Sequence, residues 1–344
     1  MKIIYDDIVY SLQKAGGISE LWQQLAYGNP KNSEHLIYAN AVENKIFRKV
    51  DGAHYITKDS GNINYTRYIN PSFNINEPFI FHSSYFRRAR DKHAINIVHV
   101  YDFIYERYRS DLKSIIHKVQ KKRAVMKSDA VICISESTKA DLLHFYPKYK
   151  GNIKVIHCGY DTEAYRFFND QKREKVIVYV GSRKRYKHFS LVIDLLKQLP
   201  DFKLMIIGSG NLTEDEIKLL KPIGDRYQKV GFLEKDELAK AYNKAYLLCY
   251  SSDYEGFGIP PIEAQACGCP VVCQMTSSLV EVVQDTGVVL YPDAIEKTAA
   301  QILDLENGDN YKILQDKGLE NVKRFSWDKC RNEVNQFYSE LSQM

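Results

Sequence analysis

The sequence has no long apolar run and no recognisable leader segment. No stretch reaches the roughly 18 consecutive apolar residues that a membrane-spanning helix needs. The first ten residues, MKIIYDDIVY, alternate without a cleavage site, so a signal peptide is not expected either. Apolar residues make up 44% of the chain and charged residues 26%, which excludes a disordered or collagen-like protein. These features predict a globular protein of the cytoplasm.

Cysteine is scarce, and its number is odd. The seven cysteines are spread over 344 residues, several of them in apolar, strand-like surroundings. We therefore expect buried reduced thiols rather than a set of disulfides. Cys267, Cys269 and Cys273 lie close together in ACGCPVVC, but structural zinc normally takes four ligands and no fourth is near in sequence. The sequence predicts no metal site.

Positive charge is concentrated in one part of the chain. The formal net charge is +5, and residues 101–150 hold eleven Lys or Arg against six Asp or Glu. The segment RRARDK at 87–92 adds more. Two interpretations of the basic region 87–127 remain open: a solvated helix face, or a surface for anionic membrane lipid or a phosphate-bearing acceptor. No nucleic-acid-binding module surrounds these charges, so a nucleic-acid partner is not expected.

Strand-like and helix-like segments alternate along the chain in two series. The first series of predicted strands covers 2–10, 79–84, 95–104, 130–135 and 153–158, with a basic amphipathic helix at 111–128. The second covers 175–183, 202–210, 228–233, 245–252, 270–274 and 287–291, with helices at 189–199, 213–221, 235–245 and 260–268. This order predicts an α/β protein with doubly wound parallel sheets.

The change in sequence composition after Tyr160 predicts a domain boundary. Residues 161–175 are polar and lack strand character, which is typical of a linker. We expect two Rossmann-like domains, 1–160 and 173–325, facing each other across a cleft. The tail 326–344 has apolar residues at helical spacing and is expected to pack back on the first domain as a helix.

Two loops at predicted strand ends suit an anion. Parallel α/β sheets bind ligands at the carboxyl ends of their strands, where helices begin. Gly16 and Gly17 precede a helix, and paired glycines let backbone amides approach a ligand, although such a pair is often only a turn. In GSRKRYKHF, four cations crowd one loop, which suits a diphosphate or forms a solvated basic turn. These cations are Arg183, Lys184, Arg185 and Lys187.

A third loop, SSDYEGFGIPP, leaves the backbone bare before a helix. Pro260 and Pro261 fit the first helical turn, where a missing N–H is tolerated. The amides of Phe257, Gly258 and Ile259 are therefore candidates to point at a ligand at the mouth of the helix.

Two carboxylates flank that bare turn. Glu255 precedes it and Glu263 lies about one turn into the helix. A carboxylate does not pair with a phosphate, so both are expected to bind hydroxyl groups, one of a ribose and one of a second sugar. Together with the cations, they indicate a nucleotide-sugar site.

These motifs resemble the retaining glycosyltransferases of family 4, which have the two-domain GT-B fold. EGFGIPPIE is similar to the family's E-x7-E motif, VYVGSRKRYKHF to its donor-diphosphate loop, and KAGGIS to its N-terminal glycine loop. FHSSYF, ISEST and KVIHCGYD extend the resemblance over nearly the whole chain.

The resemblance implies roles for individual residues. Glu263 would bind the donor ribose and Glu255 would lie near the transferred sugar, with the amides of 257–259 on the sugar or its phosphate. Arg183 and Lys187 would neutralise the leaving diphosphate, and Gly16 and Gly17 would close on the donor.

One position departs from the family pattern. Where the family commonly has His-Asp at a strand end, this chain has Tyr101-Asp102. Strand alternation points His99 to the same side as Tyr101. We expect Tyr101 and Asp102 on the acceptor side, but no general-base role for a tyrosine, because its ordinary pKa is about 10.

The implied activity is transfer of a hexose, of mannose or glucose type, from a UDP- or GDP-sugar. The acceptor would be a glycan or lipid-linked saccharide of bacterial surface polysaccharide synthesis, reached in the cytoplasm or at the inner face of the membrane. No Asp-x-Asp occurs in the chain, so a metal-bridged diphosphate is not indicated and no cofactor is expected.

Three alternatives stay open. A GT-B-type sugar-nucleotide epimerase would act on the donor alone, and a non-catalytic nucleotide-sugar-binding protein would only hold it. A Rossmann dehydrogenase would use IIGSG, which offers Gly208 and Gly210 but lacks the third glycine of the dinucleotide motif.

Overall fold

The chain folds as two compact units. The computed structural model describes residues 1–28, 33–59, 61–168, 172–208 and 210–343. Unit 1 comprises residues 1–159 and 327–344, and unit 2 comprises residues 160–326. The expected linker, 161–175, therefore belongs to unit 2, and its residues 169–171 lie outside the described ones.

Unit 1 is built on a parallel sheet. Over the described residues its seven strands follow the order β3-β2-β1-β4-β5-β6-β7. They are β1 Lys2–Asp6, β2 Ser33–Tyr38, β3 His54–Lys58, β4 Phe79–Ser83, β5 Ala94–Val100, β6 Ala130–Cys133 and β7 Asn152–Val155. The central strand β4 is buried along its whole length, as expected where helices cover both faces of a parallel sheet.

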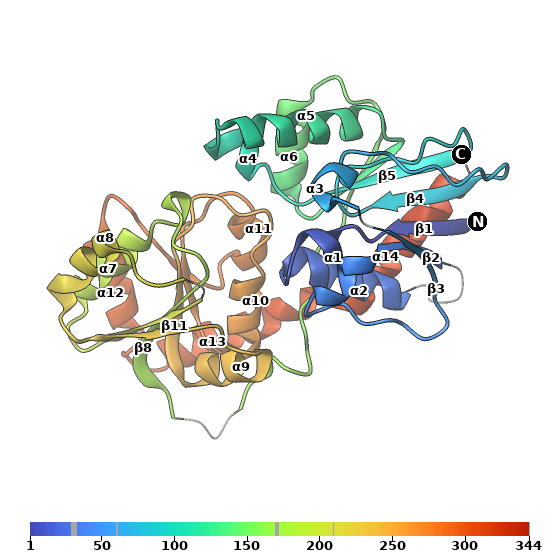
Figure 1. The fold of residues 1–344 in the computed structure, drawn as a ribbon. Helices are drawn as coiled ribbons and strands as arrows, with labels where there is room; N and C mark the ends of the chain where they lie inside the picture. The colour runs from blue at the N-terminus through green and yellow to red at the C-terminus, as the bar shows by residue number, and fades with distance from the viewer. Residues whose placement is uncertain (29–32, 60, 169–171, 209, 344) are drawn as a thin grey trace. The chain divides into compact units, whose positions relative to one another are not determined.

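Helices cover the sheet of unit 1 on both sides. They are α1 Val9–Leu12, α2 Gly17–Gly28, α3 Ile63–Thr66, α4 Ile104–Tyr108, α5 Leu112–Met126, α6 Glu136–Phe145 and α14 Trp327–Ser342. α2 and α14 pack together along one face, and α4, α5 and α6 lie along the other (Figure 1). Tyr338 of α14 hydrogen-bonds His82 of β4 at 2.5 Å, which fixes this last helix on the sheet.

Unit 2 repeats the pattern with a second parallel sheet. Over the described residues its six strands follow the order β10-β9-β8-β11-β12-β13. They are β8 Glu174–Val180, β9 Lys203–Ile207, β10 Tyr227–Val230, β11 Ala245–Tyr250, β12 Val271–Cys273 and β13 Val288–Val289. Ile177, Leu247 and Val272 fill its core and are fully buried.

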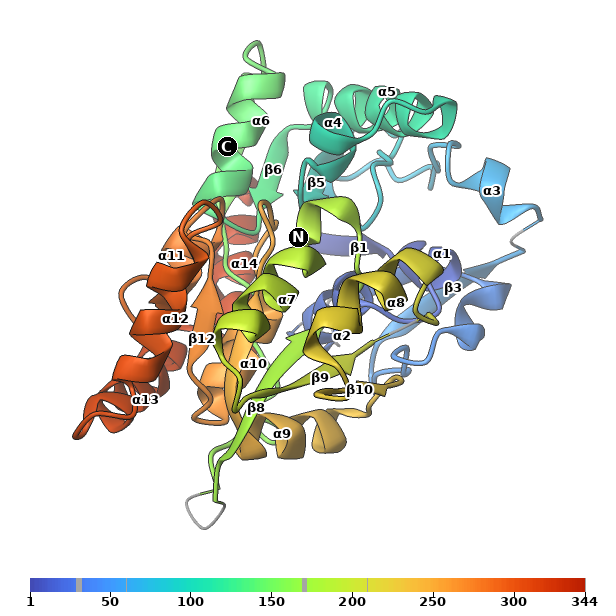
Figure 2. The same cartoon turned by 90° about the vertical axis from the view of Figure 1, so that its left-hand side faces the viewer.

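The helices of unit 2 again form two layers. They are α7 Phe189–Gln198, α8 Glu214–Leu220, α9 Lys235–Lys244, α10 Ile259–Ala266, α11 Leu279–Val283, α12 Ile295–Asp304 and α13 Asn310–Asn321. α7 packs with α8 and α12, whereas α10 packs with α9, α11 and α13 (Figure 2).

The two parallel sheets confirm the predicted fold class. The structure differs from the prediction at several elements of unit 1. The strand predicted for 95–104 ends at Val100, and Ile104 begins α4. The first strand ends at Asp6 rather than at residue 10, because residues 9–12 form α1. The strands β2 and β3 were not predicted from the sequence.

Candidate active site

Four loops of unit 2 meet at the carboxyl edge of its sheet. They follow β8, β9, β11 and β12, because parallel strands all end at the same edge. The residues predicted for donor binding in this unit lie on the loops after β8 and β11 and in α10.

The basic loop after β8 is fastened to the loop after β11. The hydroxyl of Ser251 donates to the carbonyl of Lys187 at 2.6 Å, and the amide of Asp253 donates to the carbonyl of Tyr186 at 2.9 Å. Within this loop Lys184 and Arg185 are exposed. The backbone of two strand-end loops thus determines where the cations lie.

Lys187 forms an ion pair with Glu255. Nζ of Lys187 lies 2.9 Å from Oε1 of Glu255, and the two side chains are only 14% and 12% exposed. The ammonium also lies 5.3 Å from the ring centre of Tyr250, in cation–π geometry. Burial, together with the nearby carboxylate of Glu255, raises the pKa of Tyr250 far above its usual value. The two residues predicted to act on the diphosphate and on the sugar are therefore in direct contact.

Arg183 is held by a different carboxylate. Its Nε donates to Oε1 of Glu216 at 2.7 Å, and Nη2 donates to the carbonyl of Asn211 at 3.0 Å. The side chain is 5% exposed, and Nη1 is buried without a hydrogen-bond partner among the described residues. A buried N–H without a partner is unfavourable, and an anion at this position would satisfy it.

The bare turn before α10 is supported by the loop after β12. Ser278 donates from its hydroxyl to the carbonyls of Glu255 and Phe257, at 2.9 and 2.7 Å. The amide of Glu255 in turn donates to the hydroxyl of Ser277 at 3.0 Å. These contacts shape the turn without using the carboxylate of Glu255.

Gly258 is required at the mouth of α10. Its φ of +106° lies in the left-handed region, and a Cβ there would lie 2.9 Å from Cδ2 of Leu279. Ile259 begins the helix, and Pro260 and Pro261 fill its first turn as predicted. That the amides of Phe257, Gly258 and Ile259 bind a ligand stays a prediction.

Glu263 lies on α10 and is half-buried. The hydroxyl of Tyr165 hydrogen-bonds its carboxylate, and burial followed by this carboxylate raises the pKa of Tyr165. Its predicted contact with a ribose remains a prediction.

Gly208, on the loop after β9, has a packing role. Its φ is +136°, and a Cβ there would lie 2.7 Å from the carbonyl oxygen of Gly181. The glycine that suggested a dinucleotide motif thus lets two strand-end loops approach each other. Ser209, in the same segment, lies outside the described residues.

The glycine pair of unit 1 forms the start of α2. Gly16 has a φ of +156°, and its carbonyl accepts the amide of Glu20. A Cβ at Gly16 would lie 3.0 Å from Oε1 of Gln13. Gly17 is the first helical residue, so the pair is placed at a helix N-terminus as predicted.

Tyr101 follows β5, and its hydroxyl group forms hydrogen bonds within unit 1. Its hydroxyl accepts from Nε1 of Trp22 at 2.5 Å and donates to the carbonyl of Ser84 at 3.1 Å. The residue is 7% exposed, and burial raises its pKa well above the usual value. Its ring stacks on the ring of His99, with ring centres 5.1 Å apart, in agreement with strand alternation.

The next residue, Asp102, accepts a hydrogen bond from the amide of Ile104 at 3.0 Å. Acceptor contacts from Tyr101 or Asp102 stay predictions.

The described residues contain no group of three or more His, Cys, Asp or Glu that could hold a metal ion. Burial raises the pKa of Cys269 and of Cys273 to about 12, and that of Cys267 further. These thiols therefore stay protonated at neutral pH in the protein without metal. Among the described residues, no helix combines the length and apolar character needed to cross a membrane.

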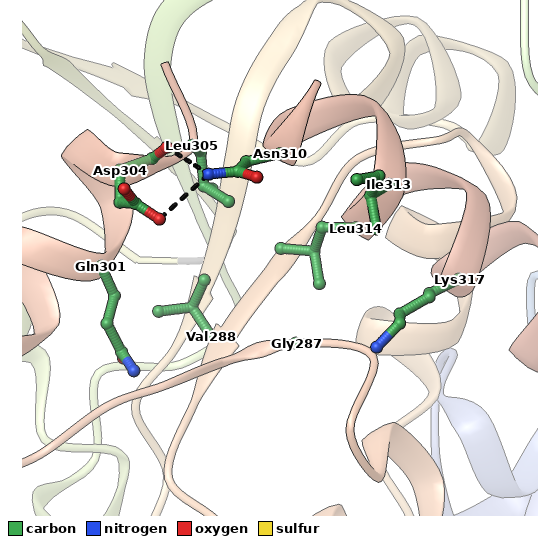
Figure 3. Close-up of a pocket in the computed structure, with 9 residues that line it drawn as sticks. All are labelled: Gly287, Val288, Gln301, Asp304, Leu305, Asn310, Ile313, Leu314 and Lys317. Atoms are coloured by element: carbon green, nitrogen blue, oxygen red, sulfur yellow. Dashed lines mark hydrogen bonds between the residues drawn. The ribbon is translucent and has the colours of Figure 1, made fainter. Parts of the chain in front are cut away.

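A separate cavity of about 300 Å³ lies elsewhere in unit 2, between α12, α13 and β13 (Figure 3). Leu305, Ile313 and Leu314 line it, and Asn310 hydrogen-bonds Asp304 at its rim. None of the predicted site residues lines it.

Family models match both units. One described as "Glycosyl transferases group 1" matches residues 161–323, and one described as "Glycosyltransferase Family 4" matches residues 30–164. The chain belongs to glycosyltransferase family 4. The predicted family is thereby confirmed.

Curated relatives include glycosyltransferases with a named activity and others that are uncharacterised. O-antigen chain mannosyltransferase B of Escherichia coli is 31% identical over 48% of this chain and 45% of its own length. An uncharacterised glycosyltransferase of Methanocaldococcus jannaschii is 31% identical over 64% and 62%. D-inositol 3-phosphate glycosyltransferase of Mycobacterium marinum is 25% identical over 70% and 57%. The chain thus spans about half to two-thirds of the length of these relatives.

Solved structures share the fold of this family 4 chain. Sucrose-phosphate synthase of Thermosynechococcus elongatus is similar with a TM-score of 0.73 and 16% identity, over 100% of both chains. HepE of Anabaena, in complex with UDP-glucose, also has a TM-score of 0.73 and 16% identity, over 99% of this chain and 100% of the other. Both likenesses confirm the GT-B fold.

Several site residues of this family 4 chain were missed by sequence reasoning. Glu216 of α8 binds Arg183, and Ser277 and Ser278 of the loop after β12 bind the turn before α10. His188, with a φ of +42°, contacts Asp253 through Nε2 at 2.5 Å. His188 ends the basic loop, and Asp253 lies two residues before Glu255. Their closeness in sequence to these two motifs is the feature by which they could have been predicted.

Proposed function

We propose that this chain transfers a hexose, with retention of configuration, from a nucleoside-diphosphate sugar to a saccharide or lipid-linked saccharide acceptor. The observation that carries the proposal is the pair of mostly buried cations, Arg183 and Lys187, at the carboxyl edge of the unit 2 sheet. The Anabaena neighbour was solved with UDP-glucose, and the Escherichia coli relative is named a mannosyltransferase, which supports a UDP- or GDP-hexose donor.

The cations act where negative charge grows. In the reaction the bond from the sugar's anomeric carbon to the phosphate oxygen breaks, and a bond to the acceptor oxygen forms. The electron pair stays on the leaving diphosphate, which takes up the acceptor's proton. Fixed cations beside these oxygens stabilise the transition state more than the ground state. Nη1 of Arg183, which lacks a hydrogen-bond partner among the described residues, is the donor best suited to this task.

Binding of the donor would exchange the partners of Lys187. A diphosphate beside its ammonium replaces the carboxylate of Glu255, which lies 2.9 Å away in the structure. Glu255 is then released to accept a hydrogen bond from a hydroxyl of the sugar, and Glu263 does the same for the ribose. Because the cations supply the positive charge, we propose a reaction that needs no metal and a donor site that needs no cofactor.

The proposed acceptor also indicates where in the cell the protein would act. A lipid-linked saccharide for bacterial surface polysaccharide would be met at the inner face of the membrane, so we propose a cytoplasmic protein that contacts this face peripherally.

Two variants test the assigned roles. Arg183→Ala and Lys187→Ala should each lower the rate of transfer by about 10²- to 10³-fold, the usual effect of removing one group that stabilises transition-state charge. The exposed neighbours Lys184→Ala and Arg185→Ala serve as matched controls and should retain most activity. Release of nucleoside diphosphate is measured in EDTA, after a thermal-shift panel of UDP, GDP and their sugars has identified the donor.

The outcomes separate the alternatives. Near-normal turnover in both alanine variants would refute the assigned roles. An isomerised donor formed without an acceptor would indicate the epimerase, and tight donor binding without diphosphate release would indicate a binding protein. Activity lost in EDTA and restored by a divalent cation would overturn the metal-free reaction.

A further inference from the structure

The helix α5 presents its apolar face to solvent. Its aliphatic side chains Leu112, Ile115, Ile116 and Val119 are 73%, 48%, 44% and 50% exposed. They occupy positions i, i+3, i+4 and i+7, which form one continuous stripe on a helix. A helix on the surface of a soluble domain normally turns such a stripe to the core. Figures 1 and 2 both draw α5 at the outer margin of unit 1.

Buried polar contacts fix this orientation of the helix. Lys121, on the opposite side of α5, is 1% exposed, and its Nζ donates to Glu106 at 3.0 Å and to the carbonyl of Asp102 at 2.5 Å. The same ammonium lies 3.7 Å from the ring centre of Phe103. His117 stacks on Tyr105 with ring centres 3.9 Å apart. Rolling the stripe inward would break a buried ion pair, so its exposure is a stable property of the fold.

The stripe is bordered by cations. α5 contains five Lys or Arg and no Asp or Glu. Lys113, Lys122 and Arg123 are exposed and have no acidic partner among the described residues. By contrast, Arg87 at the start of the basic region is buried and paired with Asp6. The positive surface predicted for residues 87–127 is therefore centred on α5.

Exposed aromatic residues lie on neighbouring segments. Tyr108, at the end of α4, is 43% exposed. Tyr65 and Tyr68, 72% and 46% exposed, belong to the α3 turn, which is joined to α5 by a hydrogen bond from Gln120 to the carbonyl of Arg67 at 2.7 Å. Tyrosine is favoured at the boundary between water and lipid, where its ring and its hydroxyl are both accommodated.

We propose that α5 is a membrane-contact helix, an inference that rests on the peripheral membrane contact of the proposed function. Leu112, Ile115, Ile116 and Val119 enter the interface of an anionic bilayer, while Lys113, Lys122 and Arg123 bind lipid phosphates. Apolar residues on one side with cations beside them are the pattern of helices that lie in a membrane interface. A second copy of this chain fits the stripe less well. A two-fold contact across α5 would bring the two sets of unpaired cations together.

Vesicle binding of the full chain tests this proposal without reference to transfer activity. The protein is sedimented with vesicles of phosphatidylcholine alone and of phosphatidylcholine mixed with phosphatidylglycerol. We expect binding to the mixed vesicles only, and binding that weakens as salt screens the charges. The double variant Ile115→Glu/Ile116→Glu should bind at least about tenfold more weakly. The variant Lys113→Gln/Lys122→Gln/Arg123→Gln should lose the dependence on phosphatidylglycerol.

Ile313→Glu is the matched control. Ile313 is an aliphatic residue of α13 in unit 2 that is 54% exposed, and its substitution should leave vesicle binding unchanged. All substituted side chains are exposed, so melting temperatures should stay close to that of the parent protein. Equal binding of parent and Ile115→Glu/Ile116→Glu, or equal binding to both kinds of vesicle, would overturn the proposal. So would a dimer in sedimentation velocity that the double variant abolishes, since the stripe would then belong to a second copy.

Discussion

The carboxylate of Glu216 binds Arg183 and the N-terminus of its own helix, α8, at once. Its Oε1 accepts from Nε of Arg183 at 2.7 Å, and its Oε2 accepts from the amide of Thr213 at 2.8 Å. The amide of Glu216 closes the capping box on the hydroxyl of Thr213 at 3.2 Å. The carboxylate that starts α8 is thus also the one that orients the guanidinium. It is a positioning residue, since it would act through Arg183.

We predict that Glu216→Gln weakens donor binding more than it weakens folding. Arg183 and Thr213 donate to different oxygens of the carboxylate, and glutamine replaces one of these oxygens with an NH₂ group, so one of the two hydrogen bonds is lost. The affinity for the nucleoside diphosphate should fall about tenfold, which corresponds to ~1.4 kcal/mol, with a smaller loss of stability. Isothermal titration and thermal melting measure the two effects. Asp215→Asn, at an exposed neighbour in the same helix turn, should change neither. An unchanged affinity in Glu216→Gln would leave the carboxylate with a capping role alone.

Some of these residues could be predicted from the sequence, and others could not. Arg183, Lys187 and Glu255 belong to motifs with fixed spacing, and the structure places each on a strand-end loop or helix mouth in unit 2. Glu216 and Ser278 could not be found in this way, because each lies more than twenty residues from the residue it contacts. Their partners follow from the order of strands in the sheet, which local patterns do not encode.

At the scale of elements, β4 and β5 bring two uncharged histidines together in the core of unit 1. His82 and His99 stack with ring centres 5.4 Å apart and are fully buried or nearly so. Burial lowers the pKa of His99 to about 3, and burial followed by electrostatic coupling to His99 lowers the pKa of His82 well below 6.5. Both therefore stay neutral in the folded protein at neutral pH.

We predict that unit 1 loses stability on the acid side. Unfolded histidines bind a proton below pH 6.5, whereas folded His99 does so only near pH 3. The stability they contribute is complete above pH 6.5 and falls toward pH 3, by up to about 1.4 kcal/mol per pH unit for each histidine. His99→Phe keeps a ring between His82 and Tyr101 and should reduce this slope. Denaturant unfolding across this range measures it, with the exposed His93→Gln as control. A slope unchanged in His99→Phe would contradict the prediction.

Several elements of unit 1 were not predicted correctly, among them the end of β1 and the strands β2 and β3. The apolar run 2–10 was interpreted as one strand, but a short apolar run does not distinguish a buried strand from a buried helical turn. Contacts distant in sequence decide the outcome: Asp6 pairs with Arg87, and Asp7 with His35 of β2. β2 and β3 were missed because SEHLIY and HYITK mix polar and apolar residues without a clear period.

At the scale of the whole molecule, unit 2 is one continuous segment and unit 1 is not. α14 completes unit 1 by burying Trp327, Cys330, Val334, Phe337, Tyr338 and Leu341. At about 1.5–3 kcal/mol for each large apolar side chain, this burial is comparable with the 5–15 kcal/mol stability of a typical domain.

We therefore predict that residues 160–326 fold alone, whereas residues 1–159 do not. Circular dichroism should show cooperative melting of the first fragment only. Adding a peptide of residues 327–344 to the second fragment should restore its melting transition, and a scrambled peptide of the same composition should not. Cooperative melting of residues 1–159 by themselves, at the temperature of the intact protein, would contradict the prediction.

The late position of α14 also sets an order of events during synthesis. Residues 1–159 leave the ribosome before unit 2, yet the helix that covers Tyr5 and His82 is made only after all of unit 2. At roughly 5–20 residues per second, one face of the first sheet stays uncovered for on the order of 10 seconds or more. Unit 1 is thus started before unit 2 but completed after it, and in that interval it has the greatest need of a chaperone.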